Sequence, residues 1–178
     1  NSSFSGTTIW NVDFDNVTAA NTRFGATYWY NSTVDGAAFS NNIWNNVSSL
    51  QVSGTPATLP GRVVKGHIVV PKAYLGGADL SGGDLSNLDL SSIAFTWTNL
   101  IGANLNGSKA VAFFLNSNVT NATFTGTTFV DATTRTAVGS AGVIGTPATL
   151  PDKWTVTGGF LVGPGAYLAN REGIANLD

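Results

Sequence analysis

The chain has 178 residues, a length that suits one domain, and its 8 basic and 10 acidic residues leave a formal net charge of −2. This balance argues against a nucleic-acid-binding surface, and the lack of cysteine excludes disulfides, thiolate metal sites and thiol nucleophiles. No apolar run approaches the ~20 residues that a membrane span needs. Asn, Ser, Thr and Gly dominate the polar positions, which suits strands joined by tight corners and is typical of secreted surface proteins. We therefore expect an all-β protein with an extracellular or cell-surface location.

Residues 1–50 repeat an apolar residue at every fifth position. These repeated residues, called centres here, are Phe4, Ile9, Phe14, Ala19, Phe24, Trp29, Val34, Phe39 and Trp44. The residue two positions before each centre is mostly small or β-branched, from Ser2 to Asn42. A period of five fits neither a helical stripe nor one face of a strand, but it suits a coil in which each pentad forms one side and turns a corner. We predict a first coil tract over residues 1–50.

Residues 51–72 interrupt this period. The letters Gly-Thr-Pro-Ala-Thr-Leu-Pro occupy residues 54–60, and the same seven letters return at residues 145–151. A β-rich stretch bounded by a proline follows each copy. We predict two equivalent insertions, over residues 51–72 and 137–165.

Each insertion reads as a β-hairpin, because turn residues stand at the middle of its β-rich stretch. Lys65-Gly66 takes this place in the first insertion and Gly158-Gly159 in the second. The apolar residues around these turns are too many for a free loop, so we expect both hairpins to pack across the flank of the coils. His67, the only histidine, is expected at the hairpin surface.

Residues 73–136 form a second predicted coil tract. Its centres are Leu75, Leu80, Leu85, Leu90, Phe95, Leu100 and Leu105 and, after a slip of one residue near Lys109, Phe114, Val119, Phe124, Phe129 and Thr134. Asp79, Asp84 and Asp89 directly precede their centres and are expected to point outward. Residues 166–178 then start a further tract.

Three triplets match the Ala-(Asp/Asn)-Leu motif: Ala78-Asp79-Leu80, Ala103-Asn104-Leu105 and Ala175-Asn176-Leu177. With the unbroken register of the centres, they make the chain resemble the pentapeptide-repeat family. The resemblance implies a right-handed quadrilateral β-helix with four pentads per coil, here carrying β-hairpin insertions. It also implies one known role, the imitation of DNA to protect gyrase, which needs a long acidic face that a net charge of −2 does not favour.

The polar residues form no recognisable catalytic, cofactor-binding or metal-binding set. Three regularly spaced acids, Asp79, Asp84 and Asp89, fall on successive sides of a coil and therefore diverge. A lone histidine cannot form a triad or a metal-ligand group. We expect a protein that is not an enzyme and needs no cofactor or metal.

Outward aromatic residues are candidates for a contact strip: Trp10, Tyr28, Tyr30 and Trp97. Trp10 and Tyr30 are separated by four pentads, so a four-sided coil places them in one column that Leu50 extends. Two interpretations stay open. The column either stabilises neighbouring coils, as cross-strand pairs do, or forms an exposed strip for lateral contact or carbohydrate stacking.

The ends of the chain suggest head-to-tail stacking. The sequence starts without a methionine and stops inside a motif, so we expect a processed or excised piece. Joining Asp178 to Asn1 keeps the register of the centres, and the residues expected to take part are Asn1, Ser2, Phe4, Ala175, Leu177 and Asp178. The function expected first is a structural fibre or surface layer built from copies of this protein or tandem repeats of a longer chain. The alternative is an adhesin or glycan-binding module and, after that, a gyrase inhibitor that mimics DNA.

Seven Asn-x-Ser/Thr sequons are candidates for N-glycosylation: Asn1, Asn16, Asn31, Asn46, Asn106, Asn118 and Asn121. The same composition would place many of these asparagines at coil corners for conformational reasons alone. The sequence therefore identifies the acceptors without deciding between these two interpretations.

Overall fold

The computed structural model describes residues 2–129, 139–141 and 143–166. Every regular element in this part of the chain is a β-strand of three residues, and none of its residues forms a helix that could cross a membrane. The chain divides into two compact units, Asn1–Leu75 and Gly76–Asp178. The predicted all-β fold is confirmed.

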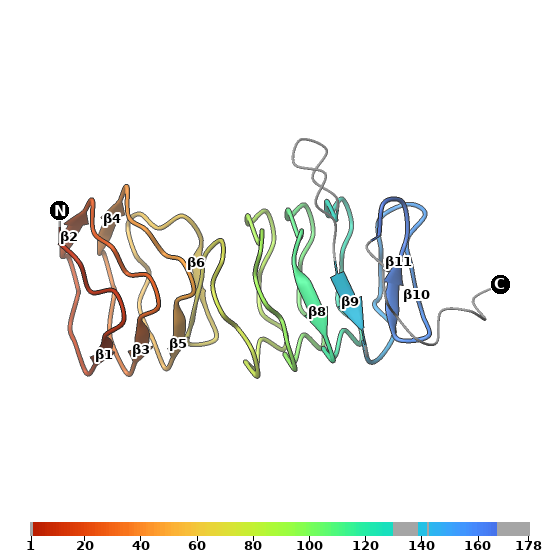
Figure 1. Ribbon diagram of the computed structural model, residues 1–178, viewed down its shortest axis with the longest axis horizontal. Coiled ribbons are helices and arrows are strands. Elements are labelled where there is room, and N and C mark those ends of the chain that lie inside the picture. The colour runs from red at the N-terminus through yellow and green to blue at the C-terminus, as the bar shows by residue number, and fades with distance from the viewer. Residues whose placement is uncertain (1, 130–138, 142, 167–178) are drawn as a thin grey trace. The chain divides into compact units, whose positions relative to one another are not determined.

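The first unit is built from regular four-sided coils. Strands β1 (Thr8–Trp10), β3 (Tyr28–Tyr30) and β5 (Ser48–Leu50) pair in parallel, and β2 (Thr18–Ala20) pairs in parallel with β4 (Ala38–Ser40). The other two sides of the coil are held by isolated bridges, such as those from Ser3 to Arg23 and from Asp13 to Thr33. Figure 1 shows β1, β3 and β5 side by side. Each side takes one pentad, so the coil closes after four pentads, as the family resemblance implies.

The corners explain why asparagine is so common. Asn11, Asn31 and Gln51 follow β1, β3 and β5 and have φ angles of 55°, 47° and 57°, in the left-handed region that asparagine tolerates better than most residues. The side chains also form ladders between coils, because Asn31 Nδ2 donates to Asn11 Oδ1 at 2.7 Å. The Asn-rich sequence therefore serves the turning of the coil.

Centres of the first unit point into the coil, as the five-residue period predicts. Phe24 and Trp29 are fully buried, and the rings of Phe24 and Trp44 stack with their centroids 4.6 Å apart. Small residues between the centres provide polar links within this core. Thr27 Oγ1, for example, donates to Phe24 O at 2.6 Å and accepts from Trp29 Nε1 at 3.1 Å.

Leucine centres fill the second unit. Leu80, Leu85, Leu90, Phe95, Leu100 and Leu105 are all fully buried. Bridges from Asp79 to Asn99 and from Asp84 to Asn104 repeat the four-pentad coil of the first unit. Strand β8 (Phe113–Leu115) pairs in parallel with β9 (Gly139–Ala141).

The predicted slip in the second tract is confirmed. Asp89 pairs with Lys109, and the next bridge along this coil joins Ala94 to Phe113. The earlier coil advances by a full pentad between these two bridges, whereas the later coil is one residue short of a pentad. The missing residue falls between Lys109 and Phe113, and two neighbouring residues there, Val111 and Ala112, are both buried. The predicted centre Thr134 lies outside the described residues.

Both predicted hairpins are present. Strands β6 (Arg62–Val64) and β7 (His67–Val69) pair in antiparallel fashion, as do β10 (Thr155–Thr157) and β11 (Phe160–Val162). The two turn residues of each hairpin have positive φ angles, 51° and 84° for Lys65-Gly66 and 55° and 78° for Gly158-Gly159. This is the type I′ geometry that matches the twist of paired strands.

The hairpins lie over the end of a core column instead of across the flank. Ile9, Trp29 and Ser49 form one inward column of the β1-β3-β5 sheet, and Ile68 N donates to Ser49 Oγ at 2.6 Å. His67 is buried, not at the surface, and its Nδ1 lies 2.5 Å from Ser49 O. Serine at a centre position therefore leaves room for the hairpin and supplies its polar anchor.

The second unit repeats this arrangement. Ser140, which pairs with Phe114, accepts a hydrogen bond from Leu161 N at 2.8 Å, as Ser49 does from Ile68. Gly159 O likewise accepts from Val143 N at 2.8 Å, and the matching bond of the first unit joins Gly66 O to Val52 N at 3.0 Å. Each unit thus ends a coil stack with the same hairpin, bonded in the same way.

Candidate functional site

The outer surface of the β1-β3-β5 sheet carries a group of exposed residues, called the aromatic face below. It consists of Thr8, Trp10, Tyr28, Tyr30, Ser48 and Leu50. Side chains alternate between the two faces of a strand, so the residue between each pair (Ile9, Trp29 or Ser49) points into the core. The parallel register sets the six outward residues in two columns of three.

One column joins Trp10, Tyr30 and Leu50, and the other joins Thr8, Tyr28 and Ser48. Trp10 is 64% exposed, more than any other large apolar side chain of the first unit's described part. Tyr28 and Leu50 are also exposed, and Tyr30 is half-buried. A group of large side chains in register on one sheet face is a candidate contact surface.

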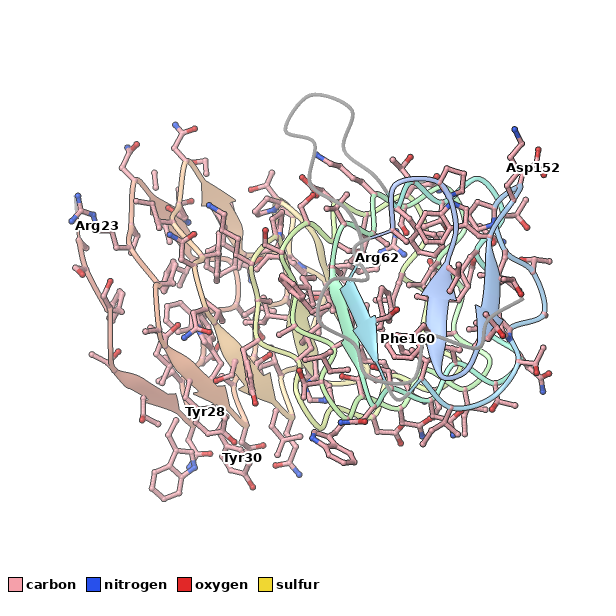
Figure 2. The ribbon with its side chains drawn as sticks, turned by 45° about the vertical axis from the view of Figure 1, so that its right-hand side comes forward. Arg23, Tyr28, Tyr30, Arg62, Asp152 and Phe160 are labelled. Carbon is pink, nitrogen blue, oxygen red and sulfur yellow. The ribbon has the colours of Figure 1, made fainter. Side chains whose placement is uncertain are left out.

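Within the described part of the aromatic face, Tyr28 and Tyr30 are the only two residues whose rings contact each other. The Tyr28 and Tyr30 rings stack within the strand, with centroids 6.3 Å apart and planes 16° from parallel. Figure 2 shows both side chains projecting from the same part of the sheet. Trp10 shares a column with Tyr30 but makes no ring contact in the described chain.

The aromatic face carries no charge. The corner residues that follow its strands, Asn11, Asn31 and Gln51, are uncharged as well and offer amide groups. The sequence singled out the aromatic residues but missed these amides and the hydroxyls of Thr8 and Ser48. Their regular recurrence, once in every coil, was the available signal.

Trp97 belongs to the second unit and is not part of the aromatic face. It occupies a coil corner with a φ angle of 60° and is 68% exposed. Tryptophan is uncommon in the left-handed region, so its place is set by the coil and not by its own preference. Trp97 is an isolated exposed ring, which makes it a suitable control for experiments on Trp10.

The regularly spaced acids hold the coil together. Asp79, Asp84 and Asp89 each accept a hydrogen bond from the backbone amide two residues later, at 3.0, 3.1 and 3.0 Å. Asp79 Oδ1 also accepts from Asn99 Nδ2 of the next coil at 3.1 Å. These carboxylates serve turns and coil contacts, and the described residues contain no group of acids and histidines that could hold a metal.

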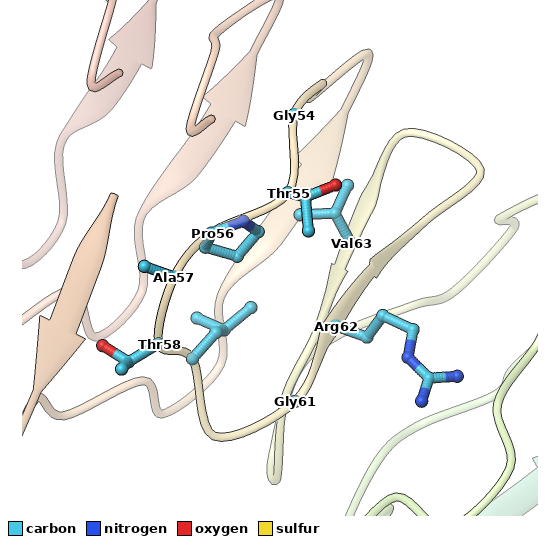
Figure 3. A pocket seen from close by; sticks show the side chains of 9 residues that line it. Gly54, Thr55, Pro56, Ala57, Thr58, Gly61, Arg62 and Val63 are labelled. Atoms are coloured by element: carbon cyan, nitrogen blue, oxygen red, sulfur yellow. The ribbon is translucent and has the colours of Figure 1, made fainter. Parts of the chain in front are cut away.

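A hollow of about 650 Å³ lies between the Gly-Thr-Pro-Ala-Thr-Leu-Pro segment and the first hairpin. Its lining residues are Gly54, Thr55, Pro56, Ala57, Thr58, Leu59, Gly61, Arg62 and Val63. Figure 3 shows the Arg62 side chain pointing away from Pro56 and Thr58. Thr58 Oγ1 donates to Phe39 O at 3.2 Å, and the lining offers no acid, histidine or thiol for general acid–base or nucleophilic chemistry.

The sequons fall into two groups. Asn16, Asn31, Asn46 and Asn121 are exposed at left-handed corners. Two others are engaged, since Asn106 Oδ1 accepts from Thr125 N at 2.7 Å and Asn118 Oδ1 accepts from Thr120 Oγ1 at 2.7 Å. Asn31 of the first group is hydrogen-bonded as well, because its Nδ2 donates to Asn11 Oδ1 at 2.7 Å, so Asn16, Asn46 and Asn121 are the accessible acceptors.

The residues expected at the stacking ends are only partly described. Ser2 is exposed, and Phe4 is 38% exposed while its ring stacks on Phe24 at 5.5 Å. Four others lie outside the described residues: Asn1, Ala175, Leu177 and Asp178. Asn1 is also the remaining sequon.

Comparison with protein-family models finds the same five-residue repeat in the sequence. A family model described as pentapeptide repeats matches residues 72–107, in eight copies. No curated protein sequence matches the chain.

Solved structures of pentapeptide repeat proteins are similar at low identity. HetL from Nostoc sp. strain PCC 7120, which is involved in heterocyst differentiation regulation, is 14% identical with a TM-score of 0.37, over 79% of this chain and 71% of its own. Rfr23 from Cyanothece 51142 is 16% identical with a TM-score of 0.22, over 84% and 88%. QnrB1, a plasmid-mediated fluoroquinolone resistance protein, is 12% identical with a TM-score of 0.28, over 84% and 89%. The family match identifies residues 72–107 as pentapeptide repeats, and coils of four pentads also occur in the first unit, outside the matched segment.

Proposed function

We propose that the protein is a non-enzymatic structural protein that stacks coil on coil into a fibre or surface layer, outside the cell or at its surface. The observation that carries this proposal is the open side of the first described coil. The composition and the exposed sequons support the extracellular location. The engagement of Asp79, Asp84 and Asp89 in turns supports the absence of catalysis.

Backbone groups on this open side point away from the sheet. Thr7 O accepts from Tyr28 N at 3.1 Å and Asn11 N donates to Tyr30 O at 3.1 Å, so these groups face β3. In a parallel ladder the amides of Thr8 and Trp10 then face the opposite direction. An edge of this kind accepts a further strand through main-chain hydrogen bonds.

Apolar residues on the same side are incompletely covered. Phe4, Val12 and Val17 are 38%, 37% and 38% exposed. Their equivalents one coil later, Phe24, Ser32 and Ala37, are at most 1% exposed. A further coil of the same width would bury these side chains and pair the free amides together, so the partner we propose is another coil of this protein, from a second copy or a successive repeat.

An inhibitor that mimics nucleic acid is the less favoured role. The net charge is −2, and the acids of the second unit are tied into turns by their own backbone. A long acidic face has no support in these features.

Sedimentation velocity and electron microscopy of matched variants test the proposal. Val17→Lys places a charge on the open side, whereas Ile43→Lys places the same charge at a side chain that is 44% exposed in a later coil. We expect the unaltered chain and the Ile43→Lys variant to form concentration-dependent assemblies with a repeat of ~4.8 Å per coil, and the Val17→Lys variant to remain monomeric. A monomeric unaltered chain at all concentrations, or equal effects of the two lysines, would contradict end-on stacking.

A further inference from the structure

We propose that the aromatic face of the first unit binds a neutral polysaccharide. This surface lies on the side of the coil, so the proposal concerns a different region from the open coil end and does not depend on stacking. The ligand class follows from three properties of the face: a free tryptophan ring, a nearly parallel pair of tyrosines, and polar groups without charge.

Trp10 is the first of these. Its side chain is 64% exposed and contacts no other ring in the described chain, although Tyr30 is its neighbour in the column. Leaving a large aromatic side chain in water forfeits most of the free energy that its burial would supply. The core of the same unit buries Trp29 and Trp44, whereas the outward position of Trp10 leaves a flat ring available to a ligand.

The tyrosine pair extends this ring into a platform. Tyr28 and Tyr30 lie two residues apart on β3 with ring planes 16° from parallel, and β1 places Trp10 one strand spacing away, ~4.8 Å. Leu50 continues the Trp10 column on the opposite side of Tyr30. Sugar rings present apolar C–H groups on their faces, and such groups pack against aromatic rings. A repeating row of side chains suits a repeating polymer better than a single small molecule.

Polar groups around the rings favour a neutral ligand. The face offers the tyrosine hydroxyls and those of Thr8 and Ser48, and the amides of Asn11 and Asn31 border it at the corner. These groups both donate and accept hydrogen bonds, as sugar hydroxyls do. A nucleic acid or an acidic glycan would require lysine or arginine on the face to neutralise its charge, and neither residue occurs there.

Affinity electrophoresis in gels that contain a soluble polysaccharide tests the proposal with the full chain. The neutral probes are hydroxyethyl cellulose, a β-1,3-glucan, glycol chitin and dextran, and the anionic probe is polygalacturonate. We expect at least one neutral polymer to retard the unaltered chain. Trp10→Ala and Tyr28→Ala should each weaken binding about ten-fold in a tryptophan-fluorescence or calorimetric titration, which corresponds to ~1.4 kcal/mol.

Trp97→Ala is the matched control, because it removes a ring of similar exposure from the second unit. It should bind like the unaltered chain, and so should Val17→Lys, which separates this proposal from coil stacking. Thermal melts show whether each variant is folded, and Trp10→Ser and Tyr28→Ser provide second variants at the same positions. Four results would overturn the proposal: no retardation by any neutral polymer, retardation by the anionic polymer alone, equal loss in Trp97→Ala, or a change in sedimentation caused by Trp10→Ala that reveals a second copy on this face.

Discussion

Inward and outward residues of one pentad differ in what a substitution does. Leu85 is fully buried, whereas its neighbour Asp84 is exposed and accepts hydrogen bonds from Ser86 N at 3.1 Å and from Asn104 Nδ2 at 3.3 Å. The two residues are adjacent in sequence but lie on opposite sides of the coil wall. This contrast makes them a matched pair for testing the pentad geometry.

Leu85→Asp should destabilise the protein severely, by about 4 kcal/mol or more, because it removes a filled core position and buries a carboxylate without a partner. Asp84→Asn keeps the Oδ1 acceptor and should cost no more than about 0.5 kcal/mol. Thermal or denaturant unfolding followed by circular dichroism measures both changes. Similar losses at the two positions would contradict the inward and outward assignment.

The sequence predicted the centres because burial and period coincide residue by residue. It also placed Trp10 outward, since that residue directly follows the centre Ile9. Ser49 and His67 could not be interpreted in this way. A serine at a centre position gives no signal of burial, and its role depends on a hydrogen bond to Ile68, a residue far along the chain.

At the scale of elements, the segment around Gly54 continues the coil although the five-residue apolar period has stopped there. Ser53 and Thr58 still pair with Thr33 and Ala38 of the preceding coil, although the centre is missing. Gly54 has a φ angle of 98°, and a Cβ there would lie 2.5 Å from Asp35 N. At this position the backbone of Gly54 packs directly against Asp35 without a side chain between them. A search for regularly spaced apolar residues cannot detect such a position.

The two hairpins differ in a pair of facing residues just outside their strands: each pair has one glycine and one larger residue, but on opposite strands. In the second hairpin Trp154 covers Gly163, where a Cβ would lie 2.3 Å from Trp154 Cδ2. In the first hairpin the equivalent residues are Gly61 and Val70, as the strand registers show. The letters of the two copies differ, but each pair contains one glycine and one side chain that packs.

This exchange also leaves a difference in volume. The Trp154 ring contacts the Phe129 ring, with centroids 4.8 Å apart. In the first unit a hollow of about 420 Å³ lies beside Trp44, Pro60 and Pro71. Pro60 and Pro71, which line this hollow, are the sequence neighbours of Gly61 and Val70.

Gly163→Val should therefore destabilise the second unit by about 2 kcal/mol, since the new side chain overlaps the indole. Trp154→Gly should be destabilising alone because it leaves a cavity, but it should partly rescue Gly163→Val by restoring the pair found in the first hairpin. A double-mutant cycle from chemical denaturation should give a coupling of at least ~1 kcal/mol. Additive effects would show that the two hairpins close their coils differently.

At the scale of the molecule, each hairpin closes the apolar end of a coil stack. Val64, Ile68, Val69 and Val70 are all at most 5% exposed, although they belong to a two-stranded hairpin that would be unstable alone. The first unit, Asn1–Leu75, includes this hairpin with its coils. It therefore contains both an aromatic core and the cover of that core.

A fragment of residues 1–75 should fold cooperatively, whereas a fragment of residues 1–58, which lacks the hairpin, should melt at a lower temperature and bind the dye ANS. The shorter fragment exposes the core residues that β7 covers, among them the end of the Trp29 column. Calorimetry and dye fluorescence at equal concentration provide the comparison. Equal melting temperatures of the two fragments would mean that the hairpin does not stabilise the coils.

The repeat of the hairpin unit was visible in the sequence because seven letters return unchanged. The period of five predicted a coil with one pentad per side, and the resemblance to the pentapeptide-repeat family implied that the coil has four sides. The candidate site was visible only in part. A spacing of one coil identifies its columns, but the free ring of Trp10 and the stacking of Tyr28 on Tyr30 depend on side-chain directions that no pattern specifies.

The corner at Asn106-Gly107 contains the chain's one Asn-Gly pair, the kind of sequence that is prone to deamidation. Loss of ammonia from such a pair begins when the glycine nitrogen attacks the asparagine side chain. Here Gly107 N donates to Thr125 O at 2.9 Å, and Asn106 Oδ1 accepts from Thr125 N at 2.7 Å, so both reacting groups are held by the next coil. Succinimide chemistry at this pair would then proceed only in molecules whose coils have come apart, and the accumulated isoaspartate would record how often that happens.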